Sequence, residues 1–171
     1  LITADDACDM IFTSGTTGKP KGAMSAHRQT IGVARAWADL GGVTADDRYL
    51  VVNPFFHSFG YKIGIVVGLL TGATLYPVAT FDVEQTMQLI QDARITVFPG
   101  APTLYQSLLS ADRSSYDLSS LRLAVTGAAV VPVVLIEQMH DVLGIAQVVT
   151  AFGMTEAVVV TMCRKGDDAE T

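Results

Sequence analysis

A ten-residue segment, Thr13 to Gly22, carries the clearest chemistry in this 171-residue chain. It reads TSGTTGKPKG and follows an apolar stretch that is typical of a buried β-strand. Glycines let backbone N–H groups face a bound anion, while hydroxyl and lysine side chains add donors and positive charge. The segment therefore predicts a polyphosphate-binding loop, with Thr13, Ser14, Gly15, Thr16, Thr17, Gly18 and Lys21 as candidate ligands.

This loop does not fit two common nucleotide motifs. A Walker A loop requires Ser or Thr after its lysine, whereas Pro20 follows Lys19, and GxGxxG does not occur. A generic surface turn rich in Ser, Thr and Gly is the alternative without a ligand. Two lysines on either side of a proline, in a segment that follows a predicted buried strand, favour phosphate binding over that alternative. GxSxG is also absent, so a serine hydrolase would lack its nucleophile elbow.

Three further segments suit a nucleotide and carboxylate site. Pro54 to Gly60 reads PFFHSFG and sets His57 between aromatic residues. Phe152 to Glu156 reads FGMTE and sets an aromatic ring, a hydroxyl and a carboxylate directly after a predicted strand. Gly127 to Ala129 forms a turn of small residues after another predicted strand. Taken singly, Phe152 would be read as core, His57 as structural and Glu156 as a solvated carboxylate.

Taken together and in this order, the segments resemble the motifs of the acyl-adenylate-forming superfamily, which comprises acyl-CoA ligases, adenylation domains of peptide synthetases, and luciferases. TSGTTGKPKG is similar to the family's phosphate-binding signature, and PFFHSFG to the motif whose His or aromatic residue gates the carboxylate site. FGMTE is similar to YGxTE, although Phe152 replaces the usual tyrosine and Ala151 stands where relatives often have glycine. The motifs are spread over residues 13 to 156, so the resemblance covers most of the chain.

The resemblance implies a reaction in which a carboxylic acid and ATP form an acyl-AMP, with release of pyrophosphate and transfer of the acyl group to coenzyme A. It implies His57, Thr155 and Glu156 as catalytic residues, with Glu156 as the Mg²⁺ ligand and Thr13 as a second candidate ligand. The loop residues above would hold the β- and γ-phosphates. The rest of the expected ATP site comprises Gly127, Ala128, Ala129, Ala151, Phe152, Gly153 and Thr155.

The acid itself is the least determined partner. Relatives build the acyl pocket from segments that correspond to residues 59–64 and 100–103, which here are apolar enough for a bulky hydrophobic acid. The chain resembles bacterial, including actinobacterial, acyl-CoA ligases of the long-chain type, which act on fatty acids or steroid-derived acids. An amino-acid-activating domain usually places an Asp in this pocket, and no acidic residue occurs between Arg48 and Phe81 or between Ile95 and Ala111. A non-catalytic nucleotide-binding module remains a third reading.

Alternating secondary structure must position these residues. Short apolar runs alternate with helix-period segments, which predicts an α/β fold with a mostly parallel sheet and flanking helices. The expected strands are residues 9–13, 22–25, 49–53, 73–76, 94–98, 123–126, 147–152 and 158–162. Helices are expected at 27–40 and 62–70 and after Asp82, Ala101 and Val131, with a loop at 111–120. Strand order does not follow from the sequence.

Composition excludes several classes of protein. Half of the residues are hydrophobic and only 16% are charged, so a disordered chain is excluded. The net charge of −6 disfavours nucleic-acid binding. The longest uncharged apolar stretches, 63–76 and 123–136, are shorter than the ~20 residues of a membrane-spanning helix. Two cysteines without CxxC spacing indicate free thiols in a reducing compartment, so we expect a cytoplasmic protein.

Low charge and a mean hydropathy of +0.39 are unusual for one domain of this size. Together with the absence of an initiator Met, they lead us to expect a single α/β region over residues 1–171, from the central part of a larger N-terminal domain. The C-terminal domain that carries the family's catalytic lysine would then lie outside the chain, and the fragment alone would be inactive. Its exposed apolar surface would allow oligomers to form.

Overall fold

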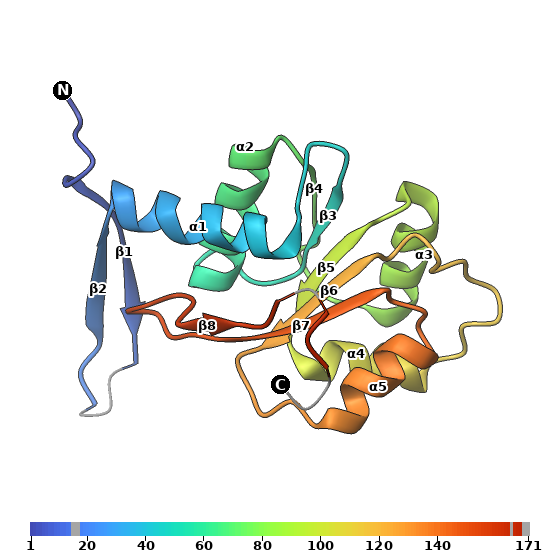
Figure 1. Cartoon of the computed structure of the whole chain (residues 1–171). Helices are drawn as coiled ribbons and strands as arrows, with labels where there is room; N and C mark the ends of the chain where they lie inside the picture. The colour runs from blue at the N-terminus through green and yellow to red at the C-terminus, as the bar shows by residue number, and fades with distance from the viewer. Residues whose placement is uncertain (15–17, 165, 169–171) are drawn as a thin grey trace.

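The computed structural model describes residues 1–14, 18–164 and 166–168. Among these residues, the central element is a six-stranded sheet in the order β4-β3-β5-β6-β7-β8 (Figure 1). Its first five strands are parallel to their neighbours, and only β8 runs antiparallel. The strands are β3 (Arg48–Val51), β4 (Thr74–Pro77), β5 (Val97–Gly100), β6 (Leu123–Gly127), β7 (Gln147–Phe152) and β8 (Thr161–Met162). The predicted fold class, a mostly parallel α/β sheet, is confirmed.

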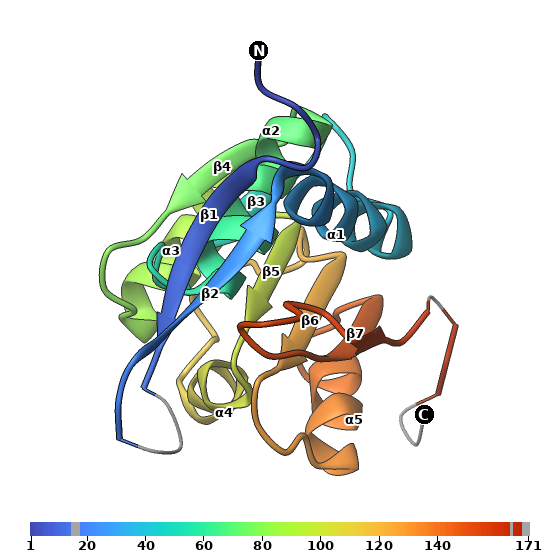
Figure 2. The ribbon, with the colours of Figure 1, turned by 90° about the vertical axis from the view of Figure 1, so that its left-hand side faces the viewer.

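Helices cover both faces of this sheet (Figures 1 and 2). One face packs against α1 (His27–Gly41), η1 (Phe59–Val66) and α2 (Val67–Thr71). The other packs against α3 (Val83–Ala93), α4 (Pro102–Ser110) and α5 (Val133–Asp141). Along β3, Tyr49 and Val51 enter the first core and Leu50 enters the second. Burial on both faces explains why the strands appear in the sequence as continuous apolar runs.

A separate antiparallel hairpin, β1 (Ala7–Thr13) and β2 (Lys21–Ala26), lies at one side of the molecule (Figure 1). Thr13 pairs with Lys21, so the predicted phosphate loop connects the two strands at this end. Its outward side chains Met10, Phe12 and Met24 are exposed. The hairpin leads directly into α1, which joins it to the rest of the fold.

The helix boundaries follow the capping signals in the sequence. Asp82 accepts a hydrogen bond of 2.9 Å from the backbone N–H of Gln85 and so caps α3. Pro102 occupies the first turn of α4, where its missing N–H costs nothing. Gly42 ends α1 with a φ of 58°, a left-handed conformation that glycine adopts without strain.

Three predicted elements differ from the structure. The helix expected at 62–70 begins at Phe59, and its first part, η1, is π-helical. Arg94 caps α3 with a φ of 53°, so the strand expected at 94–98 is instead Val97–Gly100. The strand expected at 158–162 is reduced to Thr161–Met162, because the chain must turn back after β7 and Val158 takes a φ of 41° in that turn. Tertiary context here overrides the β-propensity of a valine run.

The loop expected at 111–120 is confirmed, since the structure forms neither helix nor strand there. In the described residues, no helix is both long and apolar enough to cross a membrane.

Candidate active site

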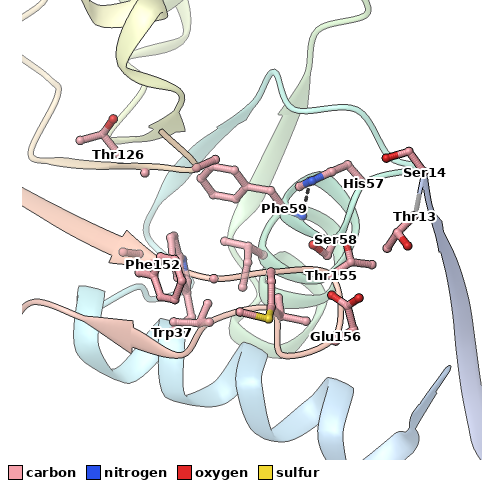
Figure 3. Close-up of a pocket in the computed structure, with 18 of the residues that line it drawn as sticks. Thr13, Ser14, Trp37, His57, Ser58, Phe59, Thr126, Phe152, Thr155 and Glu156 are labelled. Atoms are coloured by element: carbon pink, nitrogen blue, oxygen red, sulfur yellow. Dashed lines mark hydrogen bonds between the residues drawn. The ribbon is translucent and has the colours of Figure 1, made fainter. Parts of the chain in front are cut away.

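A cavity of about 520 Å³ lies where the carboxyl ends of β6 and β7 meet the hairpin and the start of η1. Ligands of open α/β sheets bind at the carboxyl ends of the strands. The cavity gathers these predicted site residues from distant parts of the sequence: Thr13, Ser14, Lys21, His57, Gly127, Ala128, Ala151, Phe152, Gly153, Thr155 and Glu156. Figure 3 shows the polar side chains of Thr13, Ser14, Thr155 and Glu156 toward one end and the rings of Phe152 and Trp37 toward the other.

The hairpin contributes the polar end through the last residue of β1 and the first of β2. The Thr13 hydroxyl donates to the Lys21 carbonyl oxygen over 3.5 Å, a weak contact that leaves the hydroxyl free to turn toward a ligand. Gly18 has a φ of 81°, which requires glycine, but does not line the cavity. Gly15, Thr16 and Thr17, also predicted ligands, lie outside the described residues.

The end of β6 closes one wall through backbone packing. A Cβ atom on Gly127 would lie 2.1 Å from the carbonyl oxygen of Ala151, so β6 and β7 can approach this closely only with glycine there. Ala128 follows with a φ of 63°, an uncommon conformation for alanine. Ala129, which we expected in the same wall, lines a second cavity instead. The small residues therefore set the spacing between two strands as well as providing a flat surface.

The end of β7 supplies the aromatic ring, the hydroxyl and the carboxylate. Phe152 is 59% exposed, so its ring is available for stacking and is not core. A Cβ on Gly153 would lie 1.7 Å from the carbonyl oxygen of Val158, because the chain folds back tightly after the strand. This fold-back presents Thr155 and the exposed Glu156 to the cavity.

His57 is held by the backbone of the motif around it. Its Nδ1 accepts a 3.1 Å hydrogen bond from the N–H of Phe59, so the neutral ring carries its proton on Nε2. Gly60 permits this turn, since a Cβ there would lie 2.2 Å from the carbonyl oxygen of Pro54. His57 therefore offers an N–H donor at the cavity wall.

The apolar wall includes Trp37, which the sequence did not mark as part of the site. Trp37 of α1 and Ile63 of η1 line the cavity, and the rings of Trp37 and Phe59 meet edge to face with centroids 5.9 Å apart. Trp37 Nε1 donates to the Tyr49 hydroxyl over 3.2 Å, and that hydroxyl donates to the Ile63 carbonyl oxygen over 2.9 Å. Complete burial raises the pKa of Tyr49, which keeps the phenol protonated as a donor.

Of the two segments expected to form the acyl pocket, only the first contributes to the cavity. Phe59 and Ile63 of the first segment line the cavity, whereas residues 100–103 line neither of these two cavities. Val158 and Val159, which we assigned to a strand, add to the apolar wall.

A second cavity of about 870 Å³ lies on the other side of the strand ends. Ala128, Ala151, Phe152 and Gly153 line both cavities, so they form a thin partition between them. Ala129 faces only the second cavity.

The donors at the polar end fit a nucleotide-bound Mg²⁺. In the part of the chain that the structure describes, no cluster of three or more His, Cys, Asp or Glu residues could form a cage for a metal. Mg²⁺ is usually held by one or two carboxylates together with substrate phosphates and water. Glu156, with the hydroxyls of Thr155 and Thr13 at the same cavity, matches that donor set.

Comparison with known proteins agrees with this geometry. The sequence model described as AMP-binding enzyme matches residues 1–171. Two relatives, from Rhodococcus jostii (strain RHA1) and Mycobacterium tuberculosis (strain ATCC 25618 / H37Rv), are 58% and 56% identical over 99% of this chain. Both are named 3-[(3aS,4S,7aS)-7a-methyl-1,5-dioxo-octahydro-1H-inden-4-yl]propanoyl:CoA ligase. The chain spans about a third of their length, 33% and 34% respectively.

Solved structures share the fold. ATP-bound MatB from Rhodopseudomonas palustris superposes with a TM-score of 0.87 at 30% identity, over 98% of this chain and 33% of that one. The inhibitor-bound N-terminal domain of FACL13 from Mycobacterium tuberculosis gives a TM-score of 0.81 at 28% identity, over 90% of this chain and 38% of that one. Since the family match spans all 171 residues and its expected motifs meet at one cavity, the chain belongs to the AMP-binding enzyme family.

Proposed function

We propose that this chain forms the substrate-binding core of an acyl-CoA ligase, whose full-length form activates a carboxylic acid with ATP and transfers the acyl group to coenzyme A. The observation that carries the proposal is that one cavity collects the hairpin donors, His57 and the segment from Phe152 to Glu156. The 58% and 56% identity to named CoA ligases supports it.

In the first step, a carboxylate oxygen of the acid attacks the α-phosphorus of ATP. The bond from that phosphorus to the oxygen bridging the β-phosphate breaks, and pyrophosphate leaves with the electron pair. Catalysis of this step depends mainly on positioning and charge stabilisation. Thr13, Ser14 and Lys21 supply hydroxyl and ammonium donors for the leaving phosphates, and Thr155 supplies one for the α-phosphate.

Other residues hold the nucleotide and the acid. Phe152 offers an exposed ring face for stacking on adenine. The Nε2–H of His57 can donate to a carboxylate oxygen of the acid. Mg²⁺ bound through Glu156 would neutralise charge on the phosphates. In the second step the sulfur of coenzyme A attacks the acyl carbon, the bond from that carbon to the phosphate oxygen breaks, AMP leaves with the electron pair, and the thiol proton passes to water.

The acid that we propose is a bulky, fused-ring propanoate of the type named for the two relatives. The apolar end of the cavity supports this class, because Trp37, Phe59, Ile63, Val158 and Val159 give it wide apolar walls. A fatty acid is the second candidate, supported by the same walls.

Thermal-shift screening of the full-length protein with acyl-sulfamoyl-adenosine analogues tests this assignment. We expect the fused-ring propanoyl analogue to raise the melting temperature more than fatty-acyl, malonyl and aminoacyl analogues, since a ligand that binds only the folded state stabilises it in proportion to affinity. Preference for the malonyl or aminoacyl analogue would contradict the assignment. In the described residues, the only carboxylate at the cavity is Glu156, which gives an amino acid's ammonium no dedicated partner.

Location and assembly belong to the same proposal. ATP and coenzyme A are cytoplasmic substrates, and Cys8 and Cys163 are free, so we place the protein in the cytoplasm. Exposed apolar side chains such as Phe12, Met24 and Val130 allow this chain by itself to associate. Cell fractionation and light scattering test these two statements.

A further inference from the structure

A buried ion pair joins the phosphate-loop hairpin to the helix that begins beside His57. The side chain of Lys62 in η1 is only 1% exposed, and its Nζ lies 3.0 Å from Asp9 Oδ1 of β1. The same ammonium donates a 2.6 Å hydrogen bond to Ser25 Oγ of β2. Asp9 Oδ2 accepts a 2.7 Å hydrogen bond from Thr30 Oγ1 of α1. Four side chains from four elements thus form one polar cluster.

The cluster lies outside the proposed active site. None of its four residues lines either cavity described above. A buried lysine is uncommon and requires a partner, since an isolated buried charge is very costly. A buried ion pair is often no more stable than an apolar replacement, so stability alone does not explain it.

Next to Asp9, Cys8 of β1 also interacts with Tyr61 of η1, so two neighbouring residues of the hairpin meet this helix. Among the described residues, the hairpin shares no strand pairing with the six-stranded sheet. The backbone hydrogen bonds from His27 and Arg28 reach Asp6 and Ala4, before the start of β1 and remote from the loop. Asp9 is four residues from Thr13, which places the ion pair closer to the loop than those contacts.

The helix that carries Lys62 also borders the first cavity. Phe59 and Ile63 of η1 line it, and Ile63 directly follows Lys62. The hydrogen bond to His57 Nδ1 comes from Phe59, the first residue of η1. Lys62 therefore connects the two walls that would hold the phosphates and the acid.

We infer that Lys62, paired with Asp9, is a positioning residue that fixes the phosphate-loop hairpin against η1. The expected effect on ATP kinetics rests on the proposed function, whereas the fixing of the hairpin against η1 does not. Loss of the pair lets the hairpin move relative to β7, so ATP binds in a poorer geometry. Small displacements of binding groups can cost one to two orders of magnitude in rate.

The structural test is hydrogen exchange on this chain. We expect Lys62→Met to speed exchange of the amides in β1 and β2, and Lys62→Arg to restore most of the protection. The double variant Asp9→Asn/Lys62→Met removes both charges, so it keeps the test valid where the single variant fails to fold. Asp47→Asn is the matched control, because the buried Asp47 forms another ion pair, with the partly exposed Arg122, at the opposite ends of the strands.

The kinetic test uses the full-length protein and ATP–pyrophosphate exchange. We expect both Lys62→Met and the double variant to lower kcat/KM for ATP by about 10- to 100-fold, with a smaller change in KM for the acid. The double variant should recover thermal stability without recovering kcat/KM, whereas Asp47→Asn should lower stability without a selective effect on ATP. Unchanged amide hydrogen exchange of the hairpin in Asp9→Asn/Lys62→Met would overturn the inference. Full recovery of kcat/KM for ATP in that variant would also overturn it. A wild type without exchange activity would refute the proposed function, while the amide measurement would still decide whether Lys62 holds the hairpin.

Discussion

The hairpin and the six-stranded sheet are built on opposite principles. The inner strands of the sheet are buried on both faces, with Leu50, Phe98 and Val125 fully or almost fully enclosed. The hairpin exposes Met10, Phe12 and Met24 and is tied to the fold by the charged side chains of Asp9 and Lys62. The sheet therefore supplies stability and fixed shape, and the hairpin presents polar side chains to the cavity, where we propose that they bind the ligand. This separation predicts which substitutions change stability and which change activity.

A pair of phenylalanine substitutions tests the separation most strongly. Phe98→Ala in β5 should lower the free energy of unfolding by about 3–5 kcal/mol, because it leaves a cavity in the core. Phe12→Ala in β1 removes the same type of side chain at a site that is 69% exposed. It should change the free energy of unfolding by less than about 0.5 kcal/mol. Urea denaturation of this chain measures both. Similar losses would mean that the hairpin face is part of the core.

Removing the carboxylate at the polar end of the cavity should lower activity and leave stability almost unchanged. Glu156→Gln in the full-length protein should lower ATP–pyrophosphate exchange by about 100-fold or more, since it removes the proposed Mg²⁺ ligand. The melting temperature should hardly change, because Glu156 is exposed. Glu137→Gln, on the exposed side of α5, is the matched control and should leave both quantities unchanged. Equal exchange in the two variants would remove Glu156 from the mechanism.

Glycine at the end of β6 is predicted to be required by the sheet itself. Gly127→Ala should lower the free energy of unfolding by about 1–3 kcal/mol, because the new Cβ meets the backbone oxygen of Ala151. Gly32→Ala is the control, since this exposed helical glycine has nothing within 4 Å and its replacement should stabilise α1 by up to about 1 kcal/mol. Thermal unfolding of the two variants gives the comparison. Tolerance of alanine at Gly127 would show that the strand ends can separate.

The smallest expected effect concerns the loss of folding stability at acidic pH. Burial acts to raise the pKa of Asp47, but hydrogen bonds from Arg122, Thr96 and the Thr44 backbone outweigh it and hold the pKa below its usual value. A carboxylate with a depressed folded pKa stabilises the fold above its unfolded pKa of about 3.9, and this contribution is lost as pH falls through the folded value. Asp47→Asn should therefore flatten the loss of stability below about pH 4, as followed by acid titration with circular dichroism. An unchanged acid limb would contradict this role.

The candidate site residues lie in short segments that the sequence could mark. The segments around Thr13, His57 and Glu156 each resemble a family motif within a few residues, and the structure brings them to one cavity, while their roles stay predictions. The α/β class also followed, because buried parallel strands and amphipathic helices have distinct patterns. Capping signals at Asp82 and Gly42 fixed two helix ends.

Features that depend on long-range packing could not be predicted in this way. Trp37 reads as helix core, and only the fold brings its ring to the cavity beside Phe59. Nothing in the sequence marks Lys62 as buried, because its partners Asp9 and Ser25 are far away in sequence. The turn at Val158 is imposed by the antiparallel return after β7, against the local preference of valine.

The central claim is that the cavity between the hairpin, η1 and the ends of β6 and β7 is a site of acid adenylation. Acid-dependent ATP–pyrophosphate exchange by the full-length wild-type protein tests it most directly. The account predicts exchange that requires Mg²⁺ and a bulky apolar carboxylic acid. Tight ATP binding without exchange, across fused-ring propanoates, fatty acids, malonate and amino acids, would contradict it and identify a nucleotide-binding module without this chemistry.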